Sequence, residues 1–165
     1  MSTLARTPPL TVSASSREDS TAAWRPRLTG LLVAVAAAAV LGVAAWLEPS
    51  PSGLGTHRQL APWGAMPACS WIQIMDCPCP ACGMTTAFAH AANGNLWASL
   101  RSQPLGCVLA LGTAMAMLAG GYVALTGSRV GSMLGRLFDR KAWWWAAGAV
   151  GLSWGYKVLA YKGGF

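Results

Sequence analysis

The stretch that decides the fold is Leu28–Leu47, LTGLLVAVAAAAVLGVAAWL, which contains neither a charged residue nor a proline. An α-helix of this length rises about 30 Å, which matches the hydrocarbon core of a bilayer. We therefore expect a transmembrane helix over residues 28–47. The sequence Val43-Ala44-Ala45 would also suit a signal peptidase. However, the apolar run is longer than that of a usual signal peptide, so a retained anchor is favoured over a cleaved leader.

A second charge-free segment covers residues 105–126. Its small residues Gly112, Ala116 and Gly120 recur at every fourth position, and such a row lets another helix approach closely inside a membrane. We expect a second transmembrane helix here, with this face turned toward a neighbouring helix.

A third apolar segment, residues 142–161, is expected to complete an all-α integral membrane protein with about three transmembrane helices. Tryptophans lie near its start, as they do at membrane interfaces. The row Ala147, Gly151 and Gly155 predicts close packing on the second transmembrane helix. Lys157 lies near the far end, where a lysine can extend its ammonium to the membrane surface.

The composition agrees with a membrane protein. Hydrophobic residues make up 54% and charged residues 10% of the chain, whereas soluble domains contain about 25% charged residues. The net charge of +7 and the nine tryptophans are compatible with nucleic-acid binding, but the basic residues lie at the edges of the apolar segments. We therefore expect the lipid bilayer as partner and no nucleic acid. A membrane-protein partner or a homo-oligomer stays open.

The distribution of Lys and Arg predicts the orientation, because cytoplasmic loops carry the excess of these residues. With the N-terminus in the cytoplasm, the inside holds Arg6, Arg17, Arg25, Arg27, Arg129, Arg136, Arg140 and Lys141, and the outside holds Arg58, Arg101, Lys157 and Lys162. We therefore expect a multi-pass protein of the cytoplasmic (inner) membrane. Residues 1–27 form a disordered cytoplasmic tail, 48–104 an extracytoplasmic loop, and 127–141 a basic cytoplasmic loop in this prediction.

Two short helices are expected within the extracytoplasmic loop. Pro80 suits the first turn of a helix, because its missing N–H would be unpaired there anyway. Asn93-Gly94 is a typical helix end, and Asn95 can cap a second helix that ends before Pro104. Both helices are too short to span, so we place them at the membrane surface.

Four of the five cysteines lie in this loop: Cys69, Cys77, Cys79 and Cys82. The pair Cys79 and Cys82 has the Cys-x-x-Cys spacing at an expected helix start, where free N–H groups favour a thiolate. This pattern is compatible with a redox-active pair in which Cys79 is the more nucleophilic thiol. The fifth, Cys107, is expected to be a small buried apolar side chain.

Two other interpretations of these cysteines stay open. All four thiolates together could form a zinc site, and disulfides among them would fasten the loop to the membrane helices. His90 lies about 12 Å along a continuous helix from Cys82, so it is not expected to share a metal with that residue. Because no complete catalytic constellation is present, a structural, partner-binding or metal-binding role is favoured over a membrane thiol–disulfide oxidoreductase, and an enzyme is not expected.

The run CPACGMTTA at residues 79–87, with Asn93-Gly94-Asn95-Leu96 and Gln103-Pro104-Leu105, resembles an uncharacterised bacterial family named domain of unknown function 2752. The likeness covers about residues 79–126. Members commonly have arginine where this chain has Thr86, and asparagine where it has Gln103. An anion or lipid contact made by that arginine would be absent here. The resemblance implies a small membrane protein with a two-cysteine signature and brings no known reaction.

Overall fold

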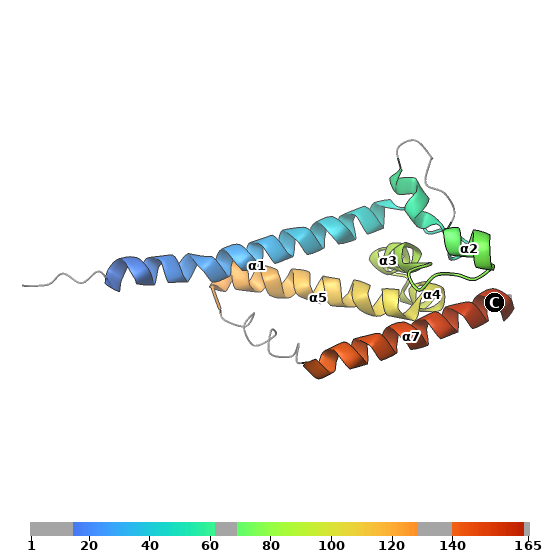
Figure 1. Cartoon of the computed structure of the whole chain (residues 1–165). Coiled ribbons are helices and arrows are strands. Elements are labelled where there is room, and N and C mark those ends of the chain that lie inside the picture. The colour runs from blue at the N-terminus through green and yellow to red at the C-terminus, as the bar shows by residue number, and fades with distance from the viewer. Residues whose placement is uncertain (1–14, 62–68, 129–139, 164–165) are drawn as a thin grey trace, which may run out of the picture.

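The computed structural model describes residues 15–61, 69–128 and 140–163, and within these ranges it contains helices and turns but no strand (Figure 1). The all-α prediction is confirmed. Three long helices run roughly along one axis: α1 (Ser15–Trp46), α5 (Pro104–Thr126) and α7 (Arg140–Gly163). The short helices gather at one end, called the short-helix end below: η1 (Thr56–Leu60), α2 (Ser70–Met75), α3 (Met84–Ala92) and α4 (Leu96–Ser102).

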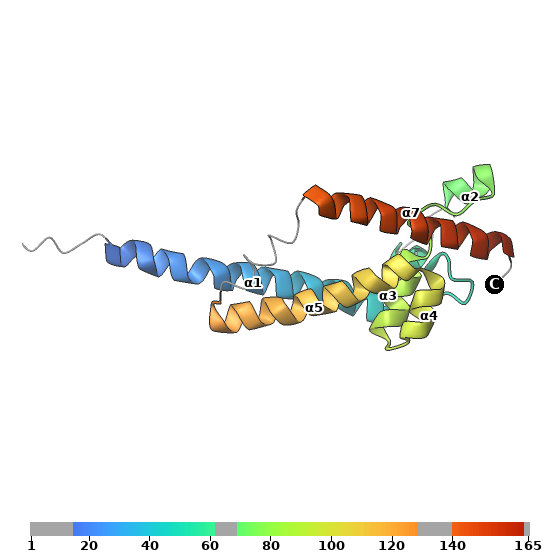
Figure 2. The ribbon, with the colours of Figure 1, turned by 90° about the horizontal axis from the view of Figure 1, so that it is seen from below.

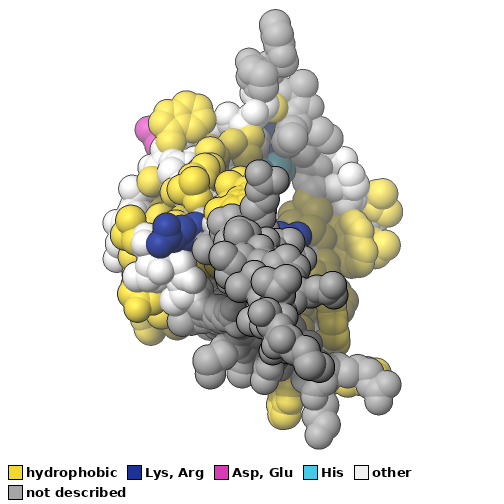
Figure 3. Space-filling model, turned by 90° about the vertical axis from the view of Figure 1, so that its left-hand side faces the viewer, with side chains coloured by type: hydrophobic (Ala, Val, Ile, Leu, Met, Phe, Trp, Pro, Cys, Tyr) yellow, Lys and Arg dark blue, Asp and Glu magenta, His cyan; other side chains and the backbone are white. Residues whose placement is uncertain are grey.

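Two of the long helices, over Trp24–Trp46 and Pro104–Thr126, are long and apolar enough to cross a membrane. Only 17% of the most apolar window of each helix is buried, so neither is the core helix of a soluble domain. Large apolar side chains such as Leu32 and Leu125 point outward instead. Viewed from the end where α1 begins, the described surface shows hydrophobic side chains on both sides of the molecule (Figure 3). These are the surfaces of a membrane protein, because apolar side chains favour lipid over water.

Helix α1 begins at Ser15, so residues 15–27 are helical although the sequence places them in a disordered tail. The rest of that predicted tail, residues 1–14, lies outside the described residues. Extending a helix is easier than nucleating one, and the apolar segment supplies the nucleus. Pro26 lies inside α1, and the hydroxyl of Thr29 donates to its carbonyl at 2.9 Å.

Helices α1 and α5 touch backbone to backbone where Gly30 crosses Gly120. A Cβ on Gly30 would lie 2.8 Å from the Gly120 oxygen, and a Cβ on Gly120 would lie 2.7 Å from the Gly30 oxygen. The two helices lie side by side in both views (Figures 1 and 2). Gly120 therefore takes part in close packing as predicted, but its partner is the first apolar helix. This contact joins α1 to α5 at the level of the backbone.

Helix α7 does not make the predicted small-residue contact with α5. A Cβ on Gly151 or Gly155 would meet nothing within 4 Å, and the same holds for Gly112 on α5. Figure 1 shows α7 displaced toward the short-helix end relative to α1 and α5. Nor is α7 among the helices apolar enough to cross a membrane, because its tryptophans and Lys157 lower its hydropathy. Of the three predicted transmembrane helices, two, α1 and α5, are therefore apolar enough to cross a membrane.

Helices α3 and α4, the two short helices that the sequence predicts, follow their local signals with one exception, whereas no helix is predicted over η1 and α2. Helix α3 ends at Ala92, before Gly94 at φ +79°, and the Asn95 side chain accepts from the Ala98 N–H at 3.1 Å to cap α4. However, α3 begins at Met84 rather than at Pro80. Gly83, at φ +88°, separates the helix from the turn that precedes it.

Candidate metal centre

Three cysteine side chains converge at the short-helix end. The Sγ atoms of Cys69, Cys79 and Cys82 all lie within 4.8 Å of one another, and those of Cys79 and Cys82 are 3.2 Å apart. Cys69 directly precedes α2. Cys79 and Cys82 flank a turn in which the Cys82 N–H donates to the Cys79 carbonyl at 3.0 Å. We call these residues the three-thiol group, and residues 69–82, which contain them, the cysteine loop.

Cys77 does not belong to the group, so only three of the four predicted zinc ligands are together. Its thiol turns back to the backbone and donates to the Pro78 carbonyl at 3.8 Å. Cys107 is buried in α5, as predicted. All five cysteines lie in the described ranges and all are free thiols, so the structure contains none of the disulfides that one interpretation required.

The thiols differ in acidity. Partial burial acts to raise the pKa of Cys69, but hydrogen bonds from the Cys82 thiol and from the N–H groups of Ile72 and Trp71 outweigh it and lower this pKa to about 7. Burial raises the pKa of Cys82 to about 12, and its hydrogen bonds with Cys79 and Cys69 add to the effect. Near neutral pH the group therefore combines a Cys69 that ionises readily with a protonated Cys82. The sequence points to Cys79 as the nucleophile, whereas the lowered pKa belongs to Cys69, whose proximity the spacing does not reveal.

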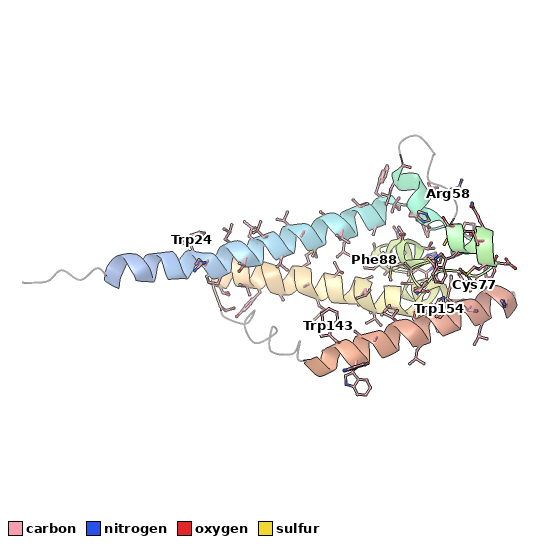
Figure 4. The ribbon with its side chains drawn as sticks, in the orientation of Figure 1. Trp24, Arg58, Cys77, Phe88, Trp143 and Trp154 are labelled. Carbon is pink, nitrogen blue, oxygen red and sulfur yellow. The ribbon has the colours of Figure 1, made fainter. Side chains whose placement is uncertain are left out.

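Side chains of Gln103, which directly precedes α5, and of Trp154 on α7 hold the cysteine loop through its proline carbonyls. The indole N–H of Trp154 donates to the Pro78 carbonyl at 2.9 Å, and the Gln103 amide donates to the Pro80 carbonyl at 3.1 Å. The Trp154 ring also meets Trp71 edge to face, with centroids 6.4 Å apart. Figure 4 shows both Trp154 and Cys77 at this end, with Trp143 toward the other end of α7. The sequence shows Trp154 only as an interfacial aromatic residue and gives no sign of this bond.

Close contacts of Gly83 and Lys157 fix the backbone that follows Cys82. The Lys157 ammonium donates to the Ser102 carbonyl at 2.8 Å and to the Gly53 carbonyl at 3.3 Å. A Cβ on Gly83 would lie 2.9 Å from the Gly53 oxygen and 3.0 Å from the Lys157 nitrogen. Lys157 is only 7% exposed, so it does not extend to the surface as expected from the sequence. It joins α7 to the loop before η1 and to the end of α4.

Thr86 and Gln103, the two positions at which the chain departs from the family that it resembles, are both buried. The Thr86 hydroxyl forms a 2.8 Å hydrogen bond with the Thr56 hydroxyl, which joins α3 to η1. Gln103 is fully buried, and its Oε1 atom has no partner among the described residues. Thr86 is therefore a packing residue. His90, in the last turn of α3, lies outside the three-thiol group, as predicted.

Residues 69–117 match the model of a family described as "Protein of unknown function (DUF2752)". The match confirms the resemblance drawn from the sequence and covers a little under a third of the chain. It begins at Cys69 and so includes all three members of the three-thiol group. No match was found among curated proteins or among solved structures.

Proposed function

We propose that this protein is a small multi-pass membrane protein that binds a thiophilic metal ion, such as zinc, at Cys69, Cys79 and Cys82. The observation that supports this proposal is the convergence of three free thiols, one from the start of α2 and two from the turn at residues 79–82. Thiolates are the ligands that zinc and other thiophilic ions prefer in proteins.

The spacing of the group suits a single ion. Zinc–sulfur bonds of about 2.3 Å place tetrahedral thiolates roughly 3.8 Å apart. The separations found are 3.2 Å for Cys79 and Cys82 and at most 4.8 Å within the group, so shifts of about an ångström per sulfur suffice. Three protein thiolates leave a fourth position for water or for a group from a partner, as in zinc sites that are not purely structural. The pKa of Cys69, lowered to about 7, makes this ligand easier to deprotonate than an ordinary thiol.

We also propose that the group lies outside the cytoplasm, at the outer face of the inner membrane, with the N-terminus inside. The excess of Lys and Arg near the opposite ends of the apolar helices supports this orientation. Helix α7 would then be a third crossing. The residue that follows α5, Gly127, lies next to Arg27 of α1, because a Cβ on Gly127 would be 3.0 Å from the Arg27 Nε atom. At the opposite end of the molecule, the Tyr161 hydroxyl of α7 donates to Asp76 of the cysteine loop at 3.1 Å. Helix α7 connects these two ends.

Metal analysis of the full-length protein in detergent tests the proposal. After purification under reducing conditions with zinc supplied, we expect one equivalent of bound metal and protection of the three thiols from maleimide until a chelator is added. Substitution of Cys69, Cys79 or Cys82 by serine should abolish retention of the metal ion. Cys77→Ser is the matched control, because this cysteine lies in the same loop but outside the group. Absence of metal from the reduced protein, or equal loss in Cys77→Ser, would contradict the proposal.

Thiol–disulfide exchange is a second candidate, favoured by the 3.2 Å separation of the Cys79 and Cys82 sulfurs. In such a reaction a disulfide of a partner is reduced to two thiols, while the Cys79 and Cys82 thiols form a disulfide and their two hydrogens pass to the partner's sulfurs. The same labelling experiment separates the candidates. An exchanging pair is recovered as a reversible disulfide with Cys69 free and without metal, whereas a metal site retains three thiolates.

A further inference from the structure

A polar cavity of about 650 Å³ opens at the short-helix end, apart from the three-thiol group. It lies between residues 50–54 and the C-terminal parts of α4 and α7. Arg101 and Lys157 supply positive charge to its wall, and His90 and Tyr161 add polar groups. No carboxylate is among the described residues that line it. The cavity therefore suits an anion.

Lys157 is the strongest reason to expect a negative ligand. Its ammonium is buried and has three N–H donors, of which two are directed at carbonyl oxygens. A neutral carbonyl does not cancel the charge, and a cation removed from water is stabilised best by an anion. One donor remains for a ligand in the cavity.

An apolar groove of about 630 Å³ adjoins the polar cavity, and the two share Arg101 and Ala160. Its other walls are apolar or aromatic: Trp97, Leu100, Pro104, Tyr156 and Leu159. Pro104 is the first residue of the membrane-length helix α5, so the groove begins where that helix enters the bilayer. Trp97 and Leu159 are about three-quarters exposed, at 75% and 74%, and no other described helix covers them.

We propose that cavity and groove together bind an anionic phospholipid. Its phosphate lies between Arg101 and Lys157, and one acyl chain follows the groove past Leu100 and Leu159. The volume of each part lies within the range of about 300–1,000 Å³ that is usual for ligand sites. The charge at one end and the apolar walls at the other match the two ends of such a lipid. This site shares no residue with the three-thiol group, but Lys157 lies close to Gly83 beside Cys82, so the test below changes Arg101 and leaves Lys157 in place.

Native mass spectrometry of the full-length protein released from nanodiscs tests this site. Nanodiscs containing phosphatidylglycerol and phosphatidylcholine in equal amounts should yield protein that retains one phosphatidylglycerol in preference to phosphatidylcholine. Arg101→Gln should reduce this retention about tenfold, because a charge-assisted contact to phosphate is lost. Arg58→Gln is the matched control, since Arg58 is an exposed arginine at the same end that does not line the cavity.

Two further measurements separate lipid binding from misfolding and from binding of free phosphate. Helical circular dichroism should be unchanged in Arg101→Gln, which shows that the variant is folded, and the Tyr156 bond to the backbone carbonyl at this position is available in it. Inorganic phosphate should compete only weakly, because it lacks the chain that fills the groove. Equal retention of the two lipids, equal retention by Arg101→Gln and Arg58→Gln, or full displacement of the lipid by millimolar phosphate would each overturn the proposal.

Discussion

Helix α5 and helix α7 are fastened to the rest of the molecule in opposite ways. Helix α5 packs on α1 through glycine backbones, and no side-chain hydrogen bond joins these two helices among the described residues. Helix α7 leaves its own glycines open and is held at the short-helix end by side-chain donors such as Trp154 and Lys157.

This difference separates two kinds of specificity. In lipid, helices gain nothing from hiding apolar surface, so the α1–α5 contact depends on how closely two backbones approach. The contact of α7 depends on hydrogen bonds that Trp154 and Lys157 donate to backbone carbonyls in the cysteine loop and at the end of α4. The first contact holds the membrane part together, and the second positions the thiols. Substitutions at the two contacts should therefore have separable effects.

The largest effect is expected from Gly120→Leu, which breaks the backbone contact. The new side chain would meet the Gly30 oxygen and the Ala34 backbone nitrogen, at 2.7 and 2.9 Å from the Cβ alone. We expect a loss of about 3 kcal/mol in the free energy of unfolding in detergent, at the upper end of the cost of overpacking. Gly112→Leu on the same helix and Gly151→Leu on α7 meet open space and should be tolerated. Equal destabilisation by all three would refute the assignment of the contact to α1 and α5.

The next effect, about 2 kcal/mol, is expected from Gly83→Ala at the short-helix end. The φ of +88° costs an alanine about 1–2 kcal/mol, and the methyl group would also press on the Gly53 carbonyl. Gly94→Ala provides the matched control, because Gly94 has a φ of +79° but no atom within 4 Å of a new Cβ. The strain of a positive φ is common to both variants, so the difference between their melting temperatures measures only the contact of the new methyl group with the Gly53 carbonyl. We expect only Gly83→Ala to expose Cys82 to maleimide in the native protein.

A smaller effect, about 1 kcal/mol, is expected from Trp154→Phe, which removes the donor to the Pro78 carbonyl but keeps an aromatic ring. The loss should appear as faster labelling of the three-thiol group, with little change at the α1–α5 contact. Trp143→Phe is the control, since Trp143 is 75% exposed. If both substitutions leave the labelling rate unchanged, the Trp154 bond does not hold the loop.

The smallest effect leaves stability unchanged and concerns reactivity with pH. Alkylation requires the thiolate, and the pKa of Cys69 is lowered to about 7 whereas that of Cys82 is raised to about 12. In metal-free, reduced protein, alkylation of Cys69 should therefore rise as the pH increases through about 7, and Cys82 should stay slow at pH 8. Peptide mass spectrometry after timed iodoacetamide treatment gives both rates. Cys82 reacting first at pH 8 would contradict the arrangement of hydrogen bonds in the group.

The sequence predicts the apolar helices because the charge-free runs are long and local. The end of α3 just before Asn93-Gly94 and the cap at Asn95 are equally local, and the structure confirms both. The partner of Gly120 was not predictable, because a row of small residues shows which face packs but not which helix it meets. Likewise, Cys69 and Cys82 are brought together by a turn and by the donors of distant residues, and the spacing of cysteines alone does not separate Cys77 from the others.

The hydrogen bond from Trp154 to the Pro78 carbonyl of the cysteine loop joins two residues that are synthesised at different times. Pro78 and Trp154 are 76 residues apart, and ribosomes add roughly 5–20 residues per second, so the donor is made about 4–15 seconds after its acceptor. During that interval Cys69, Cys79 and Cys82 have already been synthesised while nothing from α7 yet holds them. During this interval the cysteine loop lacks its α7 contacts, so its thiols are more accessible to an oxidant or a metal ion than in the finished protein.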